Sequence, residues 1–377
     1  MMRKIVAIVG NRPQFIKLAP VEAALRARGA APHMIHTGQH HDANMSEVFF
    51  RELGIPAPQE NLGISGGSHG AMTARMLAAL EERLIALAPD AVLLFGDTNS
   101  TLAAALAAVK LRLPAAHVEA GPRLHDIHNP EELNRRVADL VSGLCFCPDR
   151  VSVENLRREG RTDGVHFTGD VMYDSFRRFV APARERAAGL LARLGVAPGR
   201  FALWTVHRAE NTDDPAALRE VVSALKAAPL PAVFPMHPRT RQALERAGLL
   251  AEVEACAQVR AIPAAGYLDA LALLDSCAKV VTDSGGLQKE AFFSGKPAIV
   301  LFPETPWPAI RDDGWSTLAV DAAGKVTGAA IVEALVRFEP RGPRGDHFGD
   351  GRAAEKIAEL MLLTIRPPSG VIAGLPS

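Results

Sequence analysis

Short apolar runs alternate with longer amphipathic stretches along most of the chain. The runs are rich in β-branched residues and close on Gly, Pro or a polar residue, which is typical of buried parallel strands. In the first part of the chain the predicted strands are Lys4–Val9, Pro32–His36, Ala91–Phe95, Pro114–Val118 and Leu144–Cys147, and the predicted helices are Pro13–Arg28, Thr98–Lys110, Glu131–Ser142 and Val151–Glu159. Strands and helices that take turns in this way predict a doubly wound α/β domain.

The same alternation starts again after a stretch rich in Pro, Ala and Arg. Segment Val165–Arg178 has the pattern of a crossing between domains, and Ala181–Arg200 has that of a boundary. The later predicted strands are Phe201–Val206, Ala232–Pro235, Val259–Ile262, Lys279–Thr282 and Pro297–Leu301, and the later predicted helices are Pro215–Ala227, Tyr267–Ser276 and Gly286–Ser294. We therefore expect two Rossmann-like domains, residues 1–172 and 173–365, an interdomain cleft at the strand ends, and a flexible tail at 366–377.

The composition argues against nucleic-acid binding and membrane insertion, but it does not indicate a particular ligand. The 377 residues carry 42 basic and 42 acidic side chains, so the basic excess of a typical nucleic-acid binder is missing. No apolar run is long enough to span a bilayer and the first residues show no signal-peptide pattern, so we expect a cytoplasmic protein without a membrane partner. Cys145 and Cys147 are too closely spaced for an ordinary metal pair and fit alternate positions of a buried strand.

Two loops between a strand and a helix have the chemistry of an anion site. Gly10–Lys17 combines a glycine exit, a proline suited to a first helical position, and the cations Arg12 and Lys17. Thr282–Glu290 contains Ser284, Gly285 and Gly286, and its two glycines would let the backbone approach a phosphate closely. Each loop could also be an ordinary turn with a capping residue, and neither has the spacing of a Walker A or dinucleotide motif.

Carboxylates follow two neighbouring predicted strands. Asp97 ends one strand and Glu119 ends the next, while Glu131 lies at the start of the following helix. Adjacent parallel strands lie about 5 Å apart, so these acids should share one crevice, where mutual repulsion separates their pKa values and suits them to proton transfer. Helix capping would explain each acid separately, and Mg²⁺ binding is an alternative use of the cluster.

Histidines also follow strands. His40 follows the second predicted strand, and His207 and His237 follow strands of the second domain. Most histidines have structural roles, but His207 is accompanied by Arg208 and Glu210, so it is the stronger candidate for a phosphate contact.

These motifs resemble those of the non-hydrolysing UDP-N-acetylglucosamine 2-epimerases. The resemblance runs from Gly10–Pro13 to Phe348–Arg352, and its most specific parts are Gly96–Thr98, His117–Gly121, Pro130–Arg135, His207–Asn211 and Thr282–Glu290. It implies a GT-B-like fold of two Rossmann-type domains, a homodimer, a UDP-sugar substrate, and no metal or other cofactor. The implied reaction, an isomerisation for surface polysaccharide synthesis, eliminates UDP to form 2-acetamidoglucal and then adds UDP back.

The resemblance also implies roles for individual residues. It makes Asp97, Glu119, Glu131 and His207 catalytic, with the three carboxylates as acid/base groups and His207 assisting the departing diphosphate. The residues expected to bind substrate are Arg12, Lys17, Gln39, His40, Arg123, Arg135, His237, Ser284, Gly285, Gly286 and Glu290.

Several positions depart from the family pattern. Pro122 and Ala209 replace a common Leu and Arg, and Glu304–Trp307 stands where many members have T-E-R-P. The Trp resembles a branch that includes epimerases of UDP-linked 2,3-diacetamido-2,3-dideoxyglucuronate, although Trp307 could equally be a packing residue. The alternatives are therefore that second sugar, a hydrolysing relative, and a GT-B glycosyltransferase or binding protein.

Overall fold

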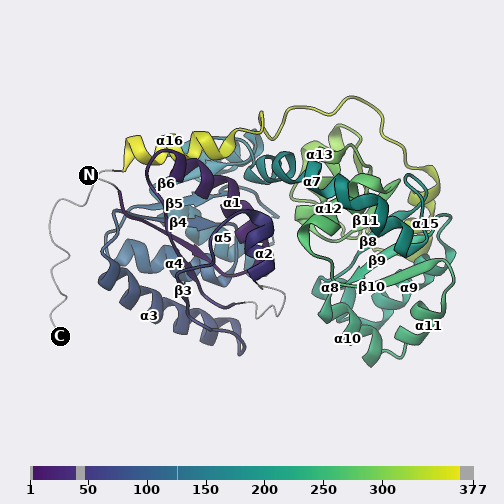
Figure 1. The fold of residues 1–377 in the computed structure, drawn as a ribbon. Coiled ribbons are helices and arrows are strands. Elements are labelled where there is room, and N and C mark those ends of the chain that lie inside the picture. The colour runs from purple at the N-terminus through teal and green to yellow at the C-terminus, as the bar shows by residue number, and fades with distance from the viewer. Residues whose placement is uncertain (1–2, 40–46, 125, 366–377) are drawn as a thin grey trace. The chain divides into compact units, whose positions relative to one another are not determined.

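The computed structural model describes residues 3–39, 47–124 and 126–365 and divides the chain into two compact units (Figure 1). The first unit comprises Met1–Ser175 together with Asp346–Ser377, and the second comprises Phe176–Gly345. Each unit contains its own parallel β-sheet, as the alternation of strands and helices predicts.

Within the described residues, the sheet of the first unit has seven strands, all paired in parallel. Its order is β3-β2-β1-β4-β5-β6-β7. Successive strands are added toward one edge of the sheet from β1 to β3 and toward the other edge from β4 onward, so the topological switch point lies between β1 and β4. The strands are β1 (Ile5–Val9), β2 (His33–His36), β3 (Glu60–Asn61), β4 (Ala91–Phe95), β5 (Ala115–Val118), β6 (Leu144–Cys147) and β7 (Val165–Phe167).

Helices of the first unit begin at polar caps that the sequence supplies. Asn11 caps α1, Thr98 forms a capping box at α4, and Asn129 caps α5 ahead of Pro130. Buried alanines of α4 allow it to pack closely against α3 and α5. The helices are α1 (Arg12–Ala27), α2 (Glu47–Leu53), α3 (His69–Leu87), α4 (Asn99–Lys110), α5 (Pro130–Val141), α6 (Arg150–Arg158) and α16 (Ala353–Thr364), and α7 (Val171–Leu194) runs on into the second unit.

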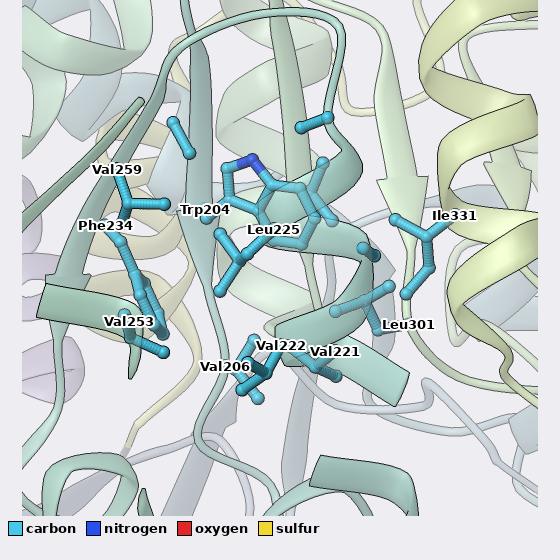
Figure 2. Packing of buried hydrophobic residues seen from close by; sticks show 14 of the residues in the cluster. Trp204, Val206, Val221, Val222, Leu225, Phe234, Val253, Val259, Leu301 and Ile331 are labelled. Carbon is cyan, nitrogen blue, oxygen red and sulfur yellow. The ribbon is translucent and has the colours of Figure 1, made fainter. Parts of the chain in front are cut away.

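The second unit repeats the arrangement with six parallel strands in the order β10-β9-β8-β11-β12-β13. Trp204 of β8 is fully buried among Val222, Leu225 and Phe234 in its core (Figure 2). The strands are β8 (Ala202–Thr205), β9 (Ala232–Met236), β10 (Val259–Pro263), β11 (Lys279–Thr282), β12 (Ala298–Val300) and β13 (Ser316–Leu318). The helices are α8 (Ala209–Thr212), α9 (Pro215–Ala227), α10 (Pro238–Arg246), α11 (Leu250–Ala255), α12 (Tyr267–Ser276), α13 (Gly285–Ser294), α14 (Pro308–Asp312) and α15 (Gly328–Arg337).

The predicted domain boundaries differ from these units at the C-terminal end. Helix α16, which was expected in the second domain, packs beside α1 in the first unit (Figure 1). Its buried face includes Ile357 and Met361, so apolar burial against the first unit decides its place. The Pro-rich stretch expected as a boundary is the second half of α7, in which Pro182 is tolerated at an exposed position. The tail predicted at 366–377 lies outside the described residues.

Cys145 and Cys147 occupy buried positions of β6, as predicted. Burial raises the pKa of the Cys145 thiol to about 12, so it stays protonated at neutral pH and is a packing residue.

In the part of the chain that the structure describes, every helix is too short or too polar to cross a membrane.

Candidate functional site

Two acids lie at adjacent strand ends of the first unit. β4 and β5 pair in register at Phe95 and Val118, so the residues just beyond them are neighbours. Gly96 turns the chain with a φ of 64°, and Asp97 follows it. Glu119 itself has a φ of 68°, which is strained for a residue with a side chain and is a feature typical of functional sites. The predicted proximity of Asp97 and Glu119 is therefore confirmed.

Arg135 of α5 holds both acids. One guanidinium nitrogen of Arg135 hydrogen-bonds to the Asp97 carboxylate and lies 3.5 Å from Glu119 Oε1, while the other donates to the Glu119 backbone oxygen at 2.5 Å. Burial alone would disfavour the charge on Arg135, but the neighbouring carboxylates outweigh that cost and raise the pKa of its guanidinium. Lys17 Nζ adds a second ion pair, 2.7 Å from Glu119 Oε1. Arg135 and Lys17, both predicted to bind substrate, therefore contact the acids.

A largely buried network of ion pairs and hydrogen bonds contacts the end of β4 through the Gly96 carbonyl. His117, in the middle of the network, contacts the Asp139 carboxylate at 2.7 Å and the Gly96 carbonyl at 2.6 Å. Arg123 donates to Asp139 at 2.8 Å and to Glu159 at 2.6 Å, and its side chain is fully buried. The structure thus gives Arg123 a supporting contact, and its predicted contact with substrate stays a prediction.

The loop after β1 is shaped by close packing. A Cβ added at Gly10 would lie 2.0 Å from Ser100 Oγ, so only glycine fits there. Gln14 accepts a hydrogen bond from the Gly10 amide at 2.6 Å and donates to Phe95 O at 2.5 Å, which ties β1 to β4. Arg12 lies over the Phe49 ring, 5.2 Å from its centroid.

Gln39 is hydrogen-bonded to another residue of the first unit, whereas Glu131 is exposed on its surface. Gln39 Oε1 accepts hydrogen bonds from the amide and the hydroxyl of Ser100, at 2.9 and 2.7 Å. Glu131 is exposed at the second position of α5, where Asn129 caps its amide at 2.9 Å. It stands one turn before Arg135 on the same side of the helix, and its predicted role as a third acid/base group stays a prediction. His40, another predicted site residue, lies outside the described residues.

In the second unit, Asp283 organises the loop that carries His207. Its buried carboxylate accepts hydrogen bonds from the backbone amides of His207 and Arg208, each at 2.9 Å, and from the Asn211 amide group at 3.1 Å. The His207 ring is partly exposed and lies 3.3 Å from Asp283 and 5.8 Å from the His237 ring, measured between centroids. The two predicted histidines are therefore together at the ends of the neighbouring strands β8 and β9.

The glycine-containing turn after β11 begins α13. Ser284 caps the helix by accepting from the Leu287 amide at 3.3 Å, so Ser284, not Asp283, is the capping residue. Glu290, one turn further along, accepts a hydrogen bond at 3.0 Å from Tyr267, whose pKa is raised by burial and by the Glu290 charge. The predicted nucleotide-binding residues thus share one short helix with its amide groups at the N-terminus.

Trp307 packs against this turn and is hydrogen-bonded to it. Its indole nitrogen donates to Gly285 O at 2.9 Å, and its ring lies 4.1 Å from the ammonium group of buried Lys289. The Trp is itself 4% exposed, so it is a packing residue that contacts the predicted phosphate loop.

Within the described residues, no group of three or more His, Cys, Asp or Glu side chains is arranged to hold a metal ion. The carboxylates considered for Mg²⁺, Asp97 and Glu119, are instead paired with Arg135 and Lys17.

The chain is similar to one family of known proteins over most of its length. A family model described as UDP-N-acetylglucosamine 2-epimerase matches residues 23–362. The chain belongs to this family. It is 43% identical over 365 residues to the UDP-2,3-diacetamido-2,3-dideoxy-D-glucuronate 2-epimerase of Pseudomonas aeruginosa, covering 95% of this chain and 99% of that protein. It is 42% identical over 359 residues to a UDP-N-acetylglucosamine 2-epimerase homolog of Methanococcus maripaludis, again covering 95% and 99%.

Solved structures agree with this membership. The crystal structure of Methanocaldococcus jannaschii UDP-GlcNAc 2-epimerase in complex with UDP-GlcNAc and UDP matches with a TM-score of 0.88 at 33% identity, covering 96% of this chain and 99% of that one. The predicted GT-B-like fold of two parallel-sheet α/β domains is confirmed, as is the predicted resemblance to this epimerase family.

Several residues of this 2-epimerase family member were not predicted as part of the site. They are buried polar groups that act through other residues, namely Gln14, Asp139, Asp283, Tyr267 and Lys289. The helical spacing of Arg135 and Asp139 places both on one side of α5, and this spacing could have drawn attention to Asp139. Nothing local in the sequence marks Tyr267, which reaches Glu290 from a different helix.

Proposed function

We propose that this family member is a non-hydrolysing UDP-N-acetylglucosamine 2-epimerase, which interconverts UDP-N-acetylglucosamine and UDP-N-acetylmannosamine. The observation that carries the proposal is the pair Asp97 and Glu119, held at adjacent strand ends by Arg135, in a chain that matches epimerases over almost its whole length. Two acids at one site can serve opposite faces of a carbon atom, which an epimerisation requires.

The reaction that fits these groups has two halves. A carboxylate removes the C2 proton while the C1–O bond breaks and UDP leaves with the bonding electrons, forming 2-acetamidoglucal. UDP then adds back at C1, and an acid returns a proton to the opposite face of C2. We assign the proton transfers to Asp97, Glu119 and Glu131, and because the C2 proton is weakly acidic, stabilisation of the leaving diphosphate is as important as the base.

The second unit is proposed to hold the UDP portion. Ser284, Gly285 and Gly286 would present the N-terminal amides of α13 to the diphosphate, and Glu290, oriented by Tyr267, would bind the ribose hydroxyls. His207 would donate to the departing diphosphate, with His237 beside it. Arg12, Lys17, Gln39, His40, Arg123 and Arg135 complete the proposed substrate-binding set.

A second substrate is favoured by one specific comparison. The 43% identical relative from Pseudomonas aeruginosa is described as acting on UDP-2,3-diacetamido-2,3-dideoxy-D-glucuronate, and the present chain has Trp307 in place of the Arg of T-E-R-P. The chemistry at C2 would be the same for this sugar. Assembly as a homodimer, a cytoplasmic location and a role in bacterial surface polysaccharide synthesis also belong to the proposal.

The test is turnover of purified protein with each of the two UDP-sugars, alongside Glu131→Gln. We expect the wild type to form the 2-epimer of at least one sugar. We expect Glu131→Gln to keep its fold and its affinity for UDP but to lose most turnover, because a carboxamide can neither remove nor supply the C2 proton. Near-normal turnover in Glu131→Gln would remove that residue from the acid/base set. Release of free sugar and UDP, or transfer of the sugar to an acceptor, would contradict the proposal.

A further inference from the structure

We propose that His117 is a positioning residue that stays doubly protonated and joins the two strand ends carrying Asp97 and Glu119. The inference rests on the proposed function for its effect on turnover, but its protonation state is a property of the fold alone. His117 is the third residue of β5 and is completely buried, so it does not touch substrate.

The two ring nitrogens of His117 both face hydrogen-bond acceptors. Nε2 lies 2.6 Å from the carbonyl oxygen of Gly96, which can only accept, so this nitrogen must carry a proton. Nδ1 lies 2.7 Å from Asp139 Oδ1. A neutral imidazole has one N–H, so the second contact needs either a proton on Nδ1 or a protonated Asp139.

The surroundings of Asp139 decide between these two states. Besides His117, the Asp139 carboxylate accepts hydrogen bonds from the Gly121 amide at 3.1 Å and from Arg123 at 2.8 Å, both on Oδ2. Burial alone would favour a neutral acid, but the contact with His117 and the charges of Arg123 and Arg135 outweigh it and lower the pKa of Asp139. Apart from His117, the Arg123 guanidinium and the Gly121 amide can only donate hydrogen bonds, so both favour the ionised carboxylate. An ionised Asp139 leaves the proton on Nδ1, and His117 is then an imidazolium.

Charge balance supports the same assignment. The ion pairs around this part of the first unit join five carboxylates to five cationic positions if His117 is counted as charged: Asp97, Glu119, Glu132, Asp139 and Glu159, with Lys17, His117, Arg123, Arg135 and Arg136. Asp139 is the carboxylate of this set that His117 contacts, and because it is 1% exposed its charge is best compensated when Arg123 and His117 are both cationic.

The position of His117 links its proton to the acid/base residues. Gly96, whose carbonyl accepts from His117, immediately precedes Asp97, and Glu119 is two residues after His117, just beyond the end of β5. Both Gly96 and Glu119 have a positive φ, so this part of the backbone needs tertiary contacts to keep its shape. We infer that the Nε2–H bond fixes the Asp97 turn relative to the Glu119 turn, and that the imidazolium charge helps keep both acids ionised.

The titratable groups around His117 come from α5, the end of β4 and β6, and from the segment that follows its own strand β5. They are Asp139 and Arg135 on α5, Asp97 beyond β4, and Cys145, its register partner on β6, together with Glu119 and Arg123 on its own segment. Cys145 is protonated at neutral pH, so Asp139 is the anion that sets the state of His117.

The first test is the protonation state itself, read from ¹⁵N shifts of the ring nitrogens in ¹⁵N-histidine-labelled full-length protein. The His117 signals are assigned by their loss in His117→Gln. In spectra recorded from about pH 6 to about pH 8, we expect both ring nitrogens of His117 to carry protons, because each lies within hydrogen-bond distance of an acceptor. His166, a half-buried histidine of β7, is the internal control, because burial lowers its pKa and it should be neutral at the upper end of that range. A neutral tautomer of His117 at pH 8 would overturn the proposal.

The second test uses two amides that keep different halves of the contact. His117→Gln can place its NH₂ near the Nε2 position and reach Gly96 O, whereas His117→Asn reaches only as far as Nδ1 and Asp139. We expect His117→Asn to lower kcat about a hundredfold and His117→Gln to lower it less, with UDP affinity unchanged in both. The acidic limb of the kcat–pH profile should move to higher pH in both variants, because both lose the cation. His166→Asn should match the wild type in both readouts.

Equal and small losses in the two amide variants, with an unmoved acidic limb, would show that His117 only fills space. If the substitutions prevent folding, the ¹⁵N measurement on the wild type still decides the proposal. If the wild type turns over neither UDP-sugar, the proposed function fails while the protonation state of His117 remains open to the same spectrum.

Discussion

Asp174 gives a pH-dependent contribution to stability that can be worked out from its surroundings. It lies on α7, is 9% exposed, and accepts hydrogen bonds from the amides of Ala353 and Ala354 at the start of α16, at 3.1 and 2.7 Å. Burial is the largest influence and exceeds the effect of the two amides, so the pKa of Asp174 rises from 3.8 to about 6.

A folded-state pKa above the unfolded value means that the native protein binds the proton more tightly. The resulting stabilisation is complete below about pH 4 and is lost as the pH rises through about 6, and at 1.36 kcal/mol per pKa unit it amounts to about 3 kcal/mol. Asp174→Asn removes this proton. The variant also loses one acceptor for the α16 amides, at a cost of about 1–2 kcal/mol that does not depend on pH.

The assay is urea unfolding of the wild type and Asp174→Asn, followed by circular dichroism at several values between about pH 4 and about pH 8. We expect the wild type to lose about 2.5 kcal/mol relative to the variant between about pH 4 and about pH 8, most of it before pH 7, because a small part of the full effect lies below pH 4. Exposed Asp163→Asn is the control and should track the wild type. A difference between wild type and Asp174→Asn that is constant with pH, or that grows in favour of the wild type as pH rises, would refute the reasoning.

Three further substitutions test separate parts of the site. Gly121→Ala should destabilise the protein by roughly 2–4 kcal/mol in thermal or urea unfolding, because φ is 91° and the new Cβ would lie 2.4 Å from Ser152 O; an unchanged midpoint would show that the loop adjusts freely. Trp307→Phe removes the indole donor to Gly285 O and should weaken UDP binding roughly fivefold by calorimetry, with little loss of stability; unchanged affinity would separate Trp307 from the UDP loop. His207→Ala should slow UDP elimination strongly while changing the melting temperature little; an elimination rate equal to that of the wild type would show that His207 has only a structural role.

Much of the fold was predictable because its signals are local. Buried parallel strands such as Ala91–Phe95 are continuous apolar runs, and Pro215 marks the start of α9, so both elements were predicted at their observed bounds. Helix α3 was missed although its apolar residues recur at helical spacing, and the stretch Ala181–Arg200 was read as a domain boundary although α7 runs through much of it, because Pro182 and several small residues weaken the helical pattern. The place of α16 depends on packing against α1, which no local pattern encodes.

The candidate site was likewise predictable only in part. Asp97 and Glu119 were expected together because adjacent parallel strands end at the same edge of a sheet, and the structure confirms this. Arg135 contacts them from a helix that follows in sequence, and the sequence alone did not show whether it would contact substrate or acid. Supporting groups such as Asp139 act through long-range contacts, so they become visible only in three dimensions.

The most direct test of the proposed activity is proton NMR of the pure protein with UDP-N-acetylglucosamine in D₂O, with EDTA present. We expect the C2 proton signal to disappear as solvent deuterium enters and the signals of the manno epimer to grow, since removal and return of that proton are the central steps. If that sugar is unchanged, the same spectrum with UDP-2,3-diacetamido-2,3-dideoxyglucuronate should show the exchange. No exchange at C2 of either sugar, or free N-acetylmannosamine accumulating with UDP, would contradict the account.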